Sequence, residues 1–302
     1  MSGNLCIYQS MKNESLKGSM LLFITAFIWG IAFAFQRSGM EYIGPITFMA
    51  ARCFLAVIFL GVLCMIIYGP KKAFRYDRAT VLGGLGCGFF MTIANNLQQM
   101  GMVYTEAGKA GFITAMYILI VPVLNVFILK KKEPLKTWIA VALGVIGLYL
   151  LCAAGTAEIE KGDILVFGCA VFFSAHILCS DRFAGTAEIV KMSFIQFFVS
   201  FVLSAAIALL TEDVSFEGIW AGRIAVAYCG ILSAGVGYTL QIVGQKTVKP
   251  AAASLIMSLE SVFAVVGGWL ILHETMSLRE LIGCAVMFAA IILVQLEPKK
   301  KS

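Results

Sequence analysis

Apolar residues gather in long runs along this chain, and short polar connectors separate the runs. A helix that crosses a bilayer needs about 20 mostly apolar residues, since each residue adds about 1.5 Å. Ten such runs occur, at residues 18–36, 44–68, 79–103, 107–129, 136–154, 162–181, 191–210, 219–243, 250–272 and 277–296. The pattern therefore predicts ten membrane-spanning segments.

These segments should be helices, because hydrocarbon does not tolerate an open sheet edge and a barrel strand has only about ten alternating residues. The composition agrees, with 60% apolar and 13% charged residues, against about 25% charged residues in soluble domains. Lys12 and Lys17 before the first run, and Ala32-Phe33-Ala34 within it, also resemble a signal peptide. Removing that run would leave the first half one helix short, so we expect an all-α polytopic membrane protein.

A short stretch of the first half recurs in the second at an offset of 143 residues, as Leu97-Gln98-x-x-Gly101 and Leu240-Gln241-x-x-Gly244. Both copies cover the end of the third helix of a half. Five helices per half is an odd number, so the second half should be inverted relative to the first. We expect two inverted five-helix repeats at 18–154 and 162–296, a connector at 155–161, and tails at 1–17 and 297–302. Such repeats place a binding site between the halves, near the midplane.

Lysine and arginine are divided unevenly between the two sets of connectors, and cytoplasmic loops are enriched in both. One set, with the two tails, holds 17: Lys12, Lys17, Lys71, Lys72, Arg75, Arg78, Lys130, Lys131, Lys132, Lys136, Arg182, Lys191, Lys246, Lys249, Lys299, Lys300 and Lys301. The alternate set holds five: Arg37, Lys109, Lys161, Arg223 and Arg279. Both termini should therefore face the cytoplasm. The excess of lysine and arginine in the cytoplasmic connectors accounts for the net charge of +6. This charge therefore gives no reason to propose a nucleic-acid partner.

The nine cysteines lie singly, without a Cys-x-x-Cys pair, so we interpret them as small packing residues rather than metal or redox ligands. The chain has no Gly-x-x-x-x-Gly-Lys-Ser/Thr loop for a nucleotide. It also lacks His-Glu-x-x-His and Gly-x-Ser-x-Gly. The sequence therefore argues against an enzyme and predicts no catalytic residue, metal or cofactor.

Residues 107–117 followed by Val121-Pro122 resemble the first-half signature of EamA-type carriers in the drug/metabolite transporter superfamily. Residues 252–264 and 268–274 resemble its second-half counterpart. Two positions depart from the pattern. Ser261 replaces the usual proline after the glutamate, which should straighten the ninth helix, and His273 replaces a glycine. The resemblance covers nearly the whole chain and implies ten helices in two inverted repeats that move small metabolites or drugs, commonly outward.

Glu260 is the sharpest candidate for a functional residue, because a charged group at a helix centre costs about 2.5–3.5 kcal/mol on insertion scales. It lies about eleven residues into the run that starts at Pro250, with no cation within a helical turn. Hydrocarbon surroundings favour the neutral acid, so Glu260 could couple transport to protons or bind substrate. The alternative is a hydrogen bond to a neighbouring helix. The sequence leaves open whether the Glu260 face or the Ser258 face lines a cavity.

The third segment carries the densest polar cluster, in which Asn95, Asn96, Gln98 and Gln99 fall within an arc of roughly 160°. This arc is too polar for lipid. Its amides could line a cavity and orient a zwitterion, a nucleobase or an aromatic amine, or they could bond to other helices.

Tyr117 lies on a stripe of the fourth segment beside Pro122, which removes a backbone donor and should bend the helix. We consider Pro122 and Pro250 candidate hinges. Prolines are also common in membrane helices without such a role.

Arg52 lies about eight residues into the second segment, some 12 Å from its outer end at about 1.5 Å per residue. It could snorkel to the interface or hold a substrate carboxylate, with Glu260 as an alternative partner. His176 could carry protons or simply pack among apolar neighbours. Gln241 is a weaker candidate, as is Trp29, because tryptophan near a helix end is often an interface anchor.

The main hypothesis is a secondary carrier in the plasma membrane, which exports a small organic metabolite or drug by alternating access. Its site would be lined by the third, fourth, eighth and ninth segments, with Glu260 as a proton switch. The expected partners are the solute, the lipid bilayer and protons. A lipid flippase and an intramembrane enzyme are the alternatives. The enzyme is disfavoured because the sequence has no set of residues arranged as a nucleophile and base or as metal ligands. The small-residue pair Gly84-x-x-x-Gly88 suits packing within a monomer or in a dimer, so the oligomeric state stays open.

Overall fold

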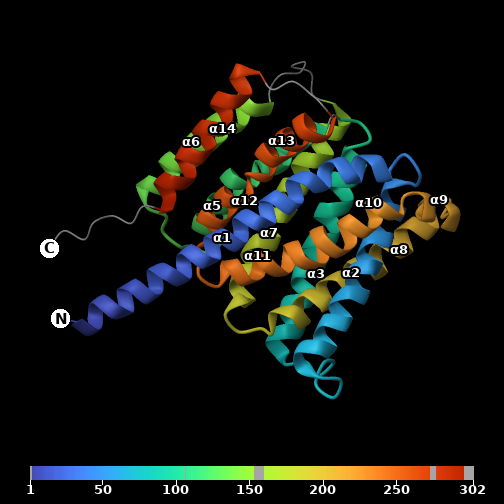
Figure 1. Ribbon diagram of the computed structural model, residues 1–302, viewed down its shortest axis with the longest axis horizontal. Helices are drawn as coiled ribbons and strands as arrows, with labels where there is room; N and C mark the ends of the chain where they lie inside the picture. Colours follow the sequence, from blue (N-terminus) through green and yellow to red (C-terminus); the bar gives the residue numbers. More distant parts are fainter. Residues whose placement is uncertain (1, 106, 153–159, 273–276, 296–302) are drawn as a thin grey trace.

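The protein is an assembly of helices, seen in a computed structural model that describes residues 2–105, 107–152, 160–272 and 277–295 (Figure 1). No strand occurs in those ranges. The elements are α1 (Ser2–Gly39), α2 (Pro45–Tyr68), α3 (Arg78–Gly101), α4 (Ala107–Ala115), α5 (Tyr117–Phe127), α6 (Leu135–Cys152), α7 (Lys161–Ala184), α8 (Ile189–Thr211), α9 (Phe216–Ala221), α10 (Arg223–Ala227), η1 (Tyr228–Gly237), α11 (Tyr238–Gln245), α12 (Pro250–Met257), α13 (Glu260–Leu272) and α14 (Leu278–Gln295).

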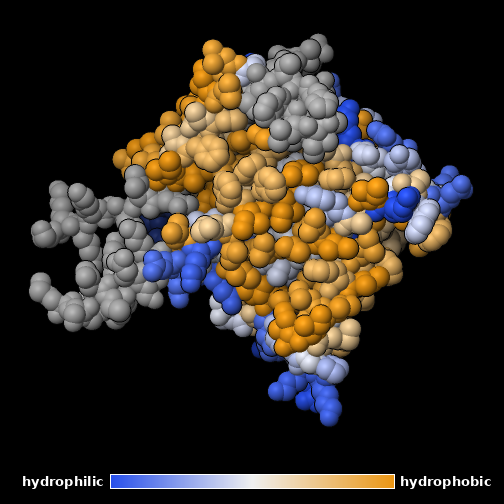
Figure 2. All heavy atoms as spheres, in the orientation of Figure 1, coloured by the Kyte–Doolittle hydropathy of each residue, from blue (hydrophilic) through white to orange (hydrophobic). Residues whose placement is uncertain are grey.

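Seven helical segments in the described part of the chain are long and apolar enough to cross a membrane. They are Asn13–Gly39, Pro45–Tyr68, Arg78–Gly101, Ala110–Phe127, Lys161–Ala184, Ile189–Thr211 and Arg223–Gln245, and three shorter apolar helices lie at Leu135–Leu150, Pro250–Val266 and Leu281–Leu293. Each segment overlaps one of the apolar runs in the sequence. Figure 2 shows orange, hydrophobic side chains over the middle of the molecule and blue, hydrophilic ones towards its ends. This surface is that of a multi-pass membrane protein.

Helix ends are fixed by side chains that satisfy free backbone N–H groups. The carboxylate of Asp77 accepts a hydrogen bond from the backbone N of Thr80 at 2.9 Å and so caps α3. This bond from the Thr80 backbone, together with one from its hydroxyl, lowers the pKa of Asp77. The start of α2 is capped from a distance, because Glu212 at the end of α8 accepts bonds from the backbone N of Ile46 and Thr47 at 2.9 and 2.8 Å. The helices α2 and α8 are therefore joined by these terminal hydrogen bonds as well as by the packing of their side chains.

The first helix differs from the sequence prediction, since α1 begins at Ser2 rather than near residue 18. The residues predicted as a tail are thus helical from Ser2 onwards.

Small residues let helices from the two halves of the chain lie close together. α3 packs against α7 and α8, α2 against α8, α6 against α14, and α1 against α11 and α13. A Cβ added at Gly101 would lie 3.0 Å from the backbone O of Gly162, and one added at Gly244 would lie 2.9 Å from the O of Gly18. Backbones in contact at this distance leave no room for a side chain.

The Gly84-x-x-x-Gly88 face is occupied within the chain. A Cβ at Gly84 would lie 2.5 Å from the Cβ of Ile195, and one at Gly88 would lie 2.9 Å from the backbone O of Gln196. Both contacts are on α8. This pair of glycines therefore joins the two halves of one chain.

Replacing Gly88 by alanine is expected to destabilise the fold by about 1–3 kcal/mol, because overpacking forces the α8 backbone to shift. The matched control is Gly168→Ala in α7, where the new Cβ would meet only the end of the Leu97 side chain at 3.3 Å. Thermal unfolding in detergent measures both. An unchanged midpoint for Gly88→Ala would show that the α3–α8 contact is looser than described.

Three segments depart from regular α-helix near the middle of the molecule. The fourth segment is interrupted at Met116, whose backbone N bonds to the O of Ile113 at 3.2 Å in a tight turn. Residues Tyr228–Gly237 form the wider π-helix, which is often found at functional sites. The ninth segment is interrupted at Ser258 and Leu259, between α12 and α13.

The interruption in the ninth segment corrects the prediction that Ser261 straightens this helix. No proline is needed for the break. Ser254 and Ser258 each donate their hydroxyl to a carbonyl three residues earlier, on Ala251 and Leu255 at 3.0 and 2.8 Å. Bonds of this kind compete with the regular helix ladder and bend it. His273, the second departure from the family pattern, lies outside the described residues.

Pro122 lies inside α5, and Pro250 is the first residue of α12. The break in the fourth segment is thus at Met116 and not at Pro122. A proline at the start of a helix removes an N–H that has no intrahelical acceptor in any case.

Candidate functional site

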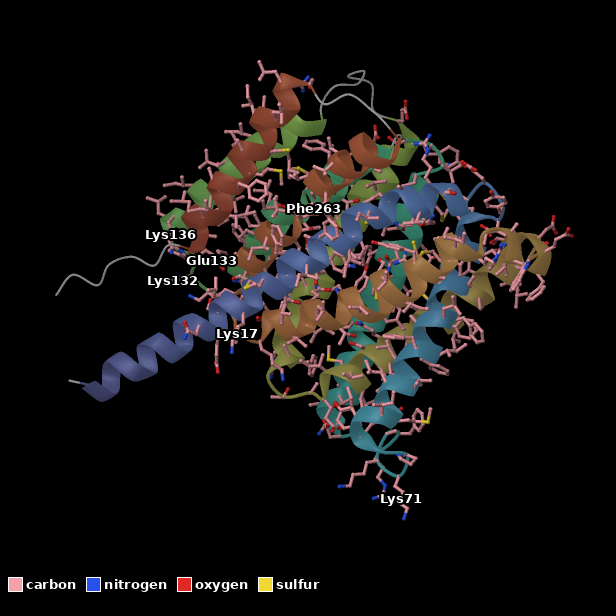
Figure 3. The ribbon with its side chains drawn as sticks, in the orientation of Figure 1. Lys17, Lys71, Lys132, Glu133, Lys136 and Phe263 are labelled. Carbon is pink, nitrogen blue, oxygen red and sulfur yellow. The ribbon has the colours of Figure 1, made fainter. Side chains whose placement is uncertain are left out.

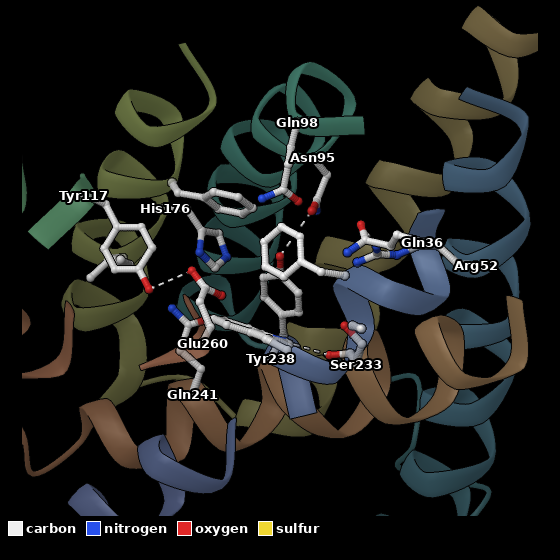
Figure 4. Close-up of a pocket in the computed structure, with 15 residues that line it drawn as sticks. Gln36, Arg52, Asn95, Gln98, Tyr117, His176, Ser233, Tyr238, Gln241 and Glu260 are labelled. Carbon is white, nitrogen blue, oxygen red and sulfur yellow. Dashed lines mark hydrogen bonds between the residues drawn. The ribbon is translucent and has the colours of Figure 1, made fainter. Parts of the chain in front are cut away.

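A polar chamber lies between the helices, with side chains from both halves around it (Figure 4). It is lined by Trp29, Ala32, Phe33, Gln36, Arg52, Asn95, Gln98, Tyr117, Phe173, His176, Ile177, Ser233, Tyr238, Gln241 and Glu260. The space that a water-sized sphere can occupy inside is about 30 Å³, or about two or three water molecules at roughly 10–15 Å³ each. The chamber is therefore narrow, and a larger solute fits only when the helices around it separate.

Arg52 provides the positive charge of the chamber. Its side chain is 2% exposed, and its Nη1 donates a hydrogen bond to Oε1 of Gln36 on α1 at 2.9 Å. Its buried Nε has no hydrogen-bond partner. The prediction that Arg52 snorkels to the interface is wrong, because the guanidinium points inward and is held there by Gln36.

Glu260 provides the acidic group. It is the first residue of α13 and 5% exposed, and its Oε1 accepts a hydrogen bond from the hydroxyl of Tyr117 at 2.9 Å. The break at Ser258 and Leu259 places this carboxyl at the N-terminus of a helix, where the helix dipole favours negative charge. The Glu260 face of the ninth segment therefore lines the chamber. The Ser261 hydroxyl instead donates to the backbone O of Gly111 on α4 at 3.1 Å.

Neutral polar groups line the chamber between the two charged residues. The hydroxyl of Tyr238 donates to Oδ1 of Asn95 at 3.2 Å, and Nε2 of Gln98 donates to the hydroxyl of Thr114 at 3.1 Å. Nδ2 of Asn95 and Oε1 of Gln241 are buried without a partner. Unsatisfied buried polar atoms are costly, so the chamber holds a free donor and a free acceptor that a bound solute can use.

His176 is fully buried at the chamber wall. Its Nε2 lies 3.2 Å from Oε1 of Gln196 on α8, and its ring meets that of Tyr238 edge-on with centroids 5.6 Å apart. Its Nδ1 has no partner. His176 is thus packed against other helices, and it also lines the chamber.

Aromatic rings form the rest of the wall. Trp29 donates its Nε1 to the backbone O of Ser233 in the π-helix at 3.1 Å and packs against Tyr238 with ring centroids 4.6 Å apart. Phe33 and Phe173 also line the chamber. The interpretation of Trp29 as an interface anchor is wrong, since its polar atom faces protein.

Two hydrogen bonds in the chamber join residues that are 143 positions apart. These are Tyr117 to Glu260 and Asn95 to Tyr238. The same offset relates Leu97-Gln98-x-x-Gly101 to Leu240-Gln241-x-x-Gly244. Equivalent positions of two repeats touch each other only where they lie beside the axis that relates the repeats.

The structure divides the predicted site residues into two groups. Arg52, Asn95, Gln98, Tyr117, His176, Gln241 and Glu260 surround the chamber, whereas Asn96 and Gln99 do not line it. Asn96 donates its Nδ2 to the hydroxyl of Ser204 on α8 at 2.8 Å, and Gln99 is fully buried. The predicted arc on α3 is thus shared between the chamber and the interior of the helix assembly.

The prediction of four lining segments was too narrow, because α1, α2 and α7 also reach the chamber. Gln36, Ser233 and Tyr238 are the polar residues that the sequence interpretation missed. Gln36 follows Trp29 and Phe33 by seven and three residues, a helical spacing that marks one face. Tyr238 stands at the repeat offset from Asn95, so extending the repeat alignment would have found it.

Comparisons with known proteins show that this chain is similar to transporters. The model of the EamA-like transporter family matches residues 16–153 and again residues 160–296. An uncharacterized transporter of Archaeoglobus fulgidus is 28% identical over 94% of this chain and 87% of its own. The uncharacterized transporter YoaV of Bacillus subtilis is 21% identical over 88% and 92%, and protein PecM of Dickeya dadantii is 23% identical over 72% and 73%. A solved crystal structure with a TM-score of 0.75 covers 92% of this chain and 96% of its own at 17% identity, which shows a shared fold.

Proposed function

Because this chain belongs to the EamA-like transporter family, and is a membrane transporter, we propose that it moves a small organic solute by alternating access around the central chamber. The observation that carries the proposal is the presence of one strongly basic and one acidic side chain inside it. Arg52 and Glu260 are 2% and 5% exposed and line the same narrow chamber. Ionisable residues are rare in membrane-spanning segments and mark substrate or ion pathways when they occur there.

The chemistry of the lining suggests how the solute is held. The Arg52 guanidinium holds an anionic group such as a carboxylate, and the amides of Asn95 and Gln241 orient the polar part. Rings of Trp29 and Phe173 pack against its apolar part. Because the free volume is small, the helices must separate to admit the solute, first on one side and then on the other.

The spacing of 143 residues supports the further proposal of two inverted five-helix repeats and ten spans in all. Tyr117 and Glu260, and Asn95 and Tyr238, are then symmetry-related pairs on either side of a pseudo-two-fold axis. The interruptions at Met116 and Leu259 are also 143 residues apart. With both termini on the basic, cytoplasmic side of the plasma membrane, rocking one repeat against the other exposes the chamber to each side alternately.

Glu260 is the group that we propose to take up and release the coupling proton. Its partner Tyr117 donates to the carboxylate, and protonation of Glu260 weakens that hydrogen bond, because a charged acceptor binds a donor more strongly than a neutral one. Since the bond joins α5 to α13, one from each half, the protonation state of Glu260 would bias the relative position of the halves. Net export follows if the proton crosses inward, down the proton gradient of the cell, while the solute crosses outward.

Replacing Tyr117 by phenylalanine tests this link, because it removes one hydroxyl and leaves the ring. A hydrogen bond to a charged group contributes about 1.5–3 kcal/mol, so we expect a roughly tenfold or greater fall in the transport rate with unchanged expression. The control is Tyr149→Phe on α6, where the side chain is 58% exposed. Equal rates for both variants would remove Tyr117 from the mechanism.

The solute class is identified first by thermal unfolding of the purified protein with amino acids, nucleosides, polyamines or cationic drugs, since a ligand of the folded state raises its stability. Solutes that raise the midpoint are then assayed in proteoliposomes with an imposed pH gradient. Transport that is independent of the gradient would contradict proton coupling. No movement of any such solute would contradict the proposed function.

A further inference from the structure

A second cavity lies at the basic end of the molecule, away from the chamber. It is formed where α5, α7 and α11 end and α12 begins, and Lys132, Lys246 and Lys249 are among its lining residues. A water-sized sphere can occupy about 280 Å³ of it, much more than in the chamber. Figure 3 shows Lys132 on this end of the molecule with Lys17 and Lys136. The cavity is wide enough for a small polar group.

The charges of this cavity do not cancel. Its two carboxylates already have partners, because Asp181 lies 3.7 Å from Nζ of Lys131 and Glu133 accepts a short hydrogen bond from Nδ2 of Asn125. Within the described residues, Lys132, Lys246 and Lys249 have no such carboxylate partner. Four lysines and two carboxylates line the cavity, so the lining keeps a net charge of +2, because the neutral amide of Asn125 does not cancel the charge of Glu133.

The start of α12 borders the same cavity. Pro250, its first residue, lines the cavity, and the preceding Lys249 makes no side-chain capping bond. Proline has no N–H to donate, so the helix start contributes the positive end of its dipole, which favours a nearby anion. The helix N-terminus and the lysines thus favour the same kind of ligand.

Two buried amides provide an independent sign of a ligand. Asn125 and Gln245 line the cavity and are each 3% exposed. Their nitrogens are used, in the Glu133 contact and in a 3.0 Å bond from Gln245 to the backbone O of Ile177, whereas their side-chain oxygens have no donor. A ligand for this cavity should therefore carry hydroxyl donors beside its negative charge.

We propose that this cavity binds the phosphate of an organic phosphate that also carries hydroxyl groups. The phosphate lies against the lysines and the start of α12, since lysine binds phosphate as a point charge. The hydroxyls donate to Asn125 and Gln245. Such a group comes either from a soluble sugar or glycerol phosphate, or from the head group of phosphatidylglycerol, because basic pockets between helices on the cytoplasmic side bind anionic head groups. The inference does not depend on what the central chamber transports.

The test is the thermal unfolding midpoint of the full chain at low salt, with inorganic phosphate or glycerol 3-phosphate, and in nanodiscs of phosphatidylcholine with or without phosphatidylglycerol. The variant replaces Lys132, Lys246 and Lys249 by glutamine. Each lysine near an anionic surface contributes about fivefold in affinity, so the triple variant should bind roughly a hundredfold more weakly. All three side chains are exposed, and the midpoint without ligand reports whether the variant folds.

The matched control replaces three cations of the α2–α3 connector by glutamine, Lys71, Lys72 and Arg75, which leave the cavity intact. A midpoint raised by glycerol 3-phosphate supports a soluble ligand, and one raised only by phosphatidylglycerol supports a head group, provided that the lysine variant loses the effect and the control keeps it. No rise with any probe, or an equal loss in variant and control, would overturn the proposal.

Discussion

Substitution of Glu260 by glutamine is expected to abolish the pH dependence of transport and to lower the gradient-driven rate at least tenfold. Glutamine keeps the size and the hydrogen-bonding capacity of the protonated acid, but it cannot release a proton. The hydroxyl of Tyr117 can still donate to its amide oxygen, but this is the weaker bond that a neutral acceptor makes. The variant is therefore held in the arrangement that the neutral acid favours.

The measurement is uptake into proteoliposomes over a range of pH, with Glu217→Gln as the control for loss of a carboxylate. Glu217 lies exposed on α9, away from the chamber. Exchange of labelled solute without a gradient should persist in the Glu260 variant if the solute still binds. An unchanged rate and pH profile in a normally expressed variant would exclude Glu260 from coupling.

Substitution of Arg52 by methionine is expected to lower transport of anionic or zwitterionic solutes by roughly thirtyfold or more, as losing one member of a buried charge pair costs about 2–5 kcal/mol. The stability of the fold should change far less. Removing a buried cation relieves its desolvation cost, and this gain offsets the loss of the 2.9 Å bond to Gln36.

A second substitution separates the two effects of Arg52. Gln36→Leu added to Arg52→Met removes the amide that would be left without a partner, so the double variant should unfold at the wild-type temperature or above. Arg223→Met, at an exposed arginine of α10, is the control for a lost charge. If Arg52→Met transported the same solutes at the wild-type rate, the anion-holding role of Arg52 would be wrong.

The apolar runs predicted where the helices lie, because the bilayer imposes one length and one composition on every span. Because every span has a similar composition, the sequence does not show where the backbone of a span is irregular. Nothing in the run at 219–243 distinguishes the π-helix at Tyr228–Gly237 from a regular helix. The break in the fourth segment is at Met116, six residues before Pro122, the residue from which the sequence predicted a bend. These features depend on packing against other helices, which a local pattern does not contain.

The polar site residues were the easier part of the prediction, because a charged or amide group among apolar residues stands out. Arg52 and Glu260 were found in this way. Tyr238 was missed because a tyrosine in an apolar helix is often only a packing residue. For Asn96 the sequence left a cavity and a bond to another helix as alternatives, and the bond to Ser204 supports the second, since α3 packs against α7 and α8 as well as facing the chamber. Helix periodicity identifies which side chains share a polar face, but it does not identify whether that face contacts a cavity or another helix.

The hydrogen bond between Tyr117 and Glu260 also bears on how such a site can arise during evolution. In a dimer of two identical five-helix chains, a residue beside the symmetry axis meets its own copy. The position would hold two glutamates, which repel each other when ionised, or two tyrosines, which hold no proton to exchange near neutral pH. Joining duplicated halves into one gene lets the two copies mutate separately. On the symmetry proposed above, two repeats in one chain therefore allow an acid to face a phenol across the axis, which two identical chains do not.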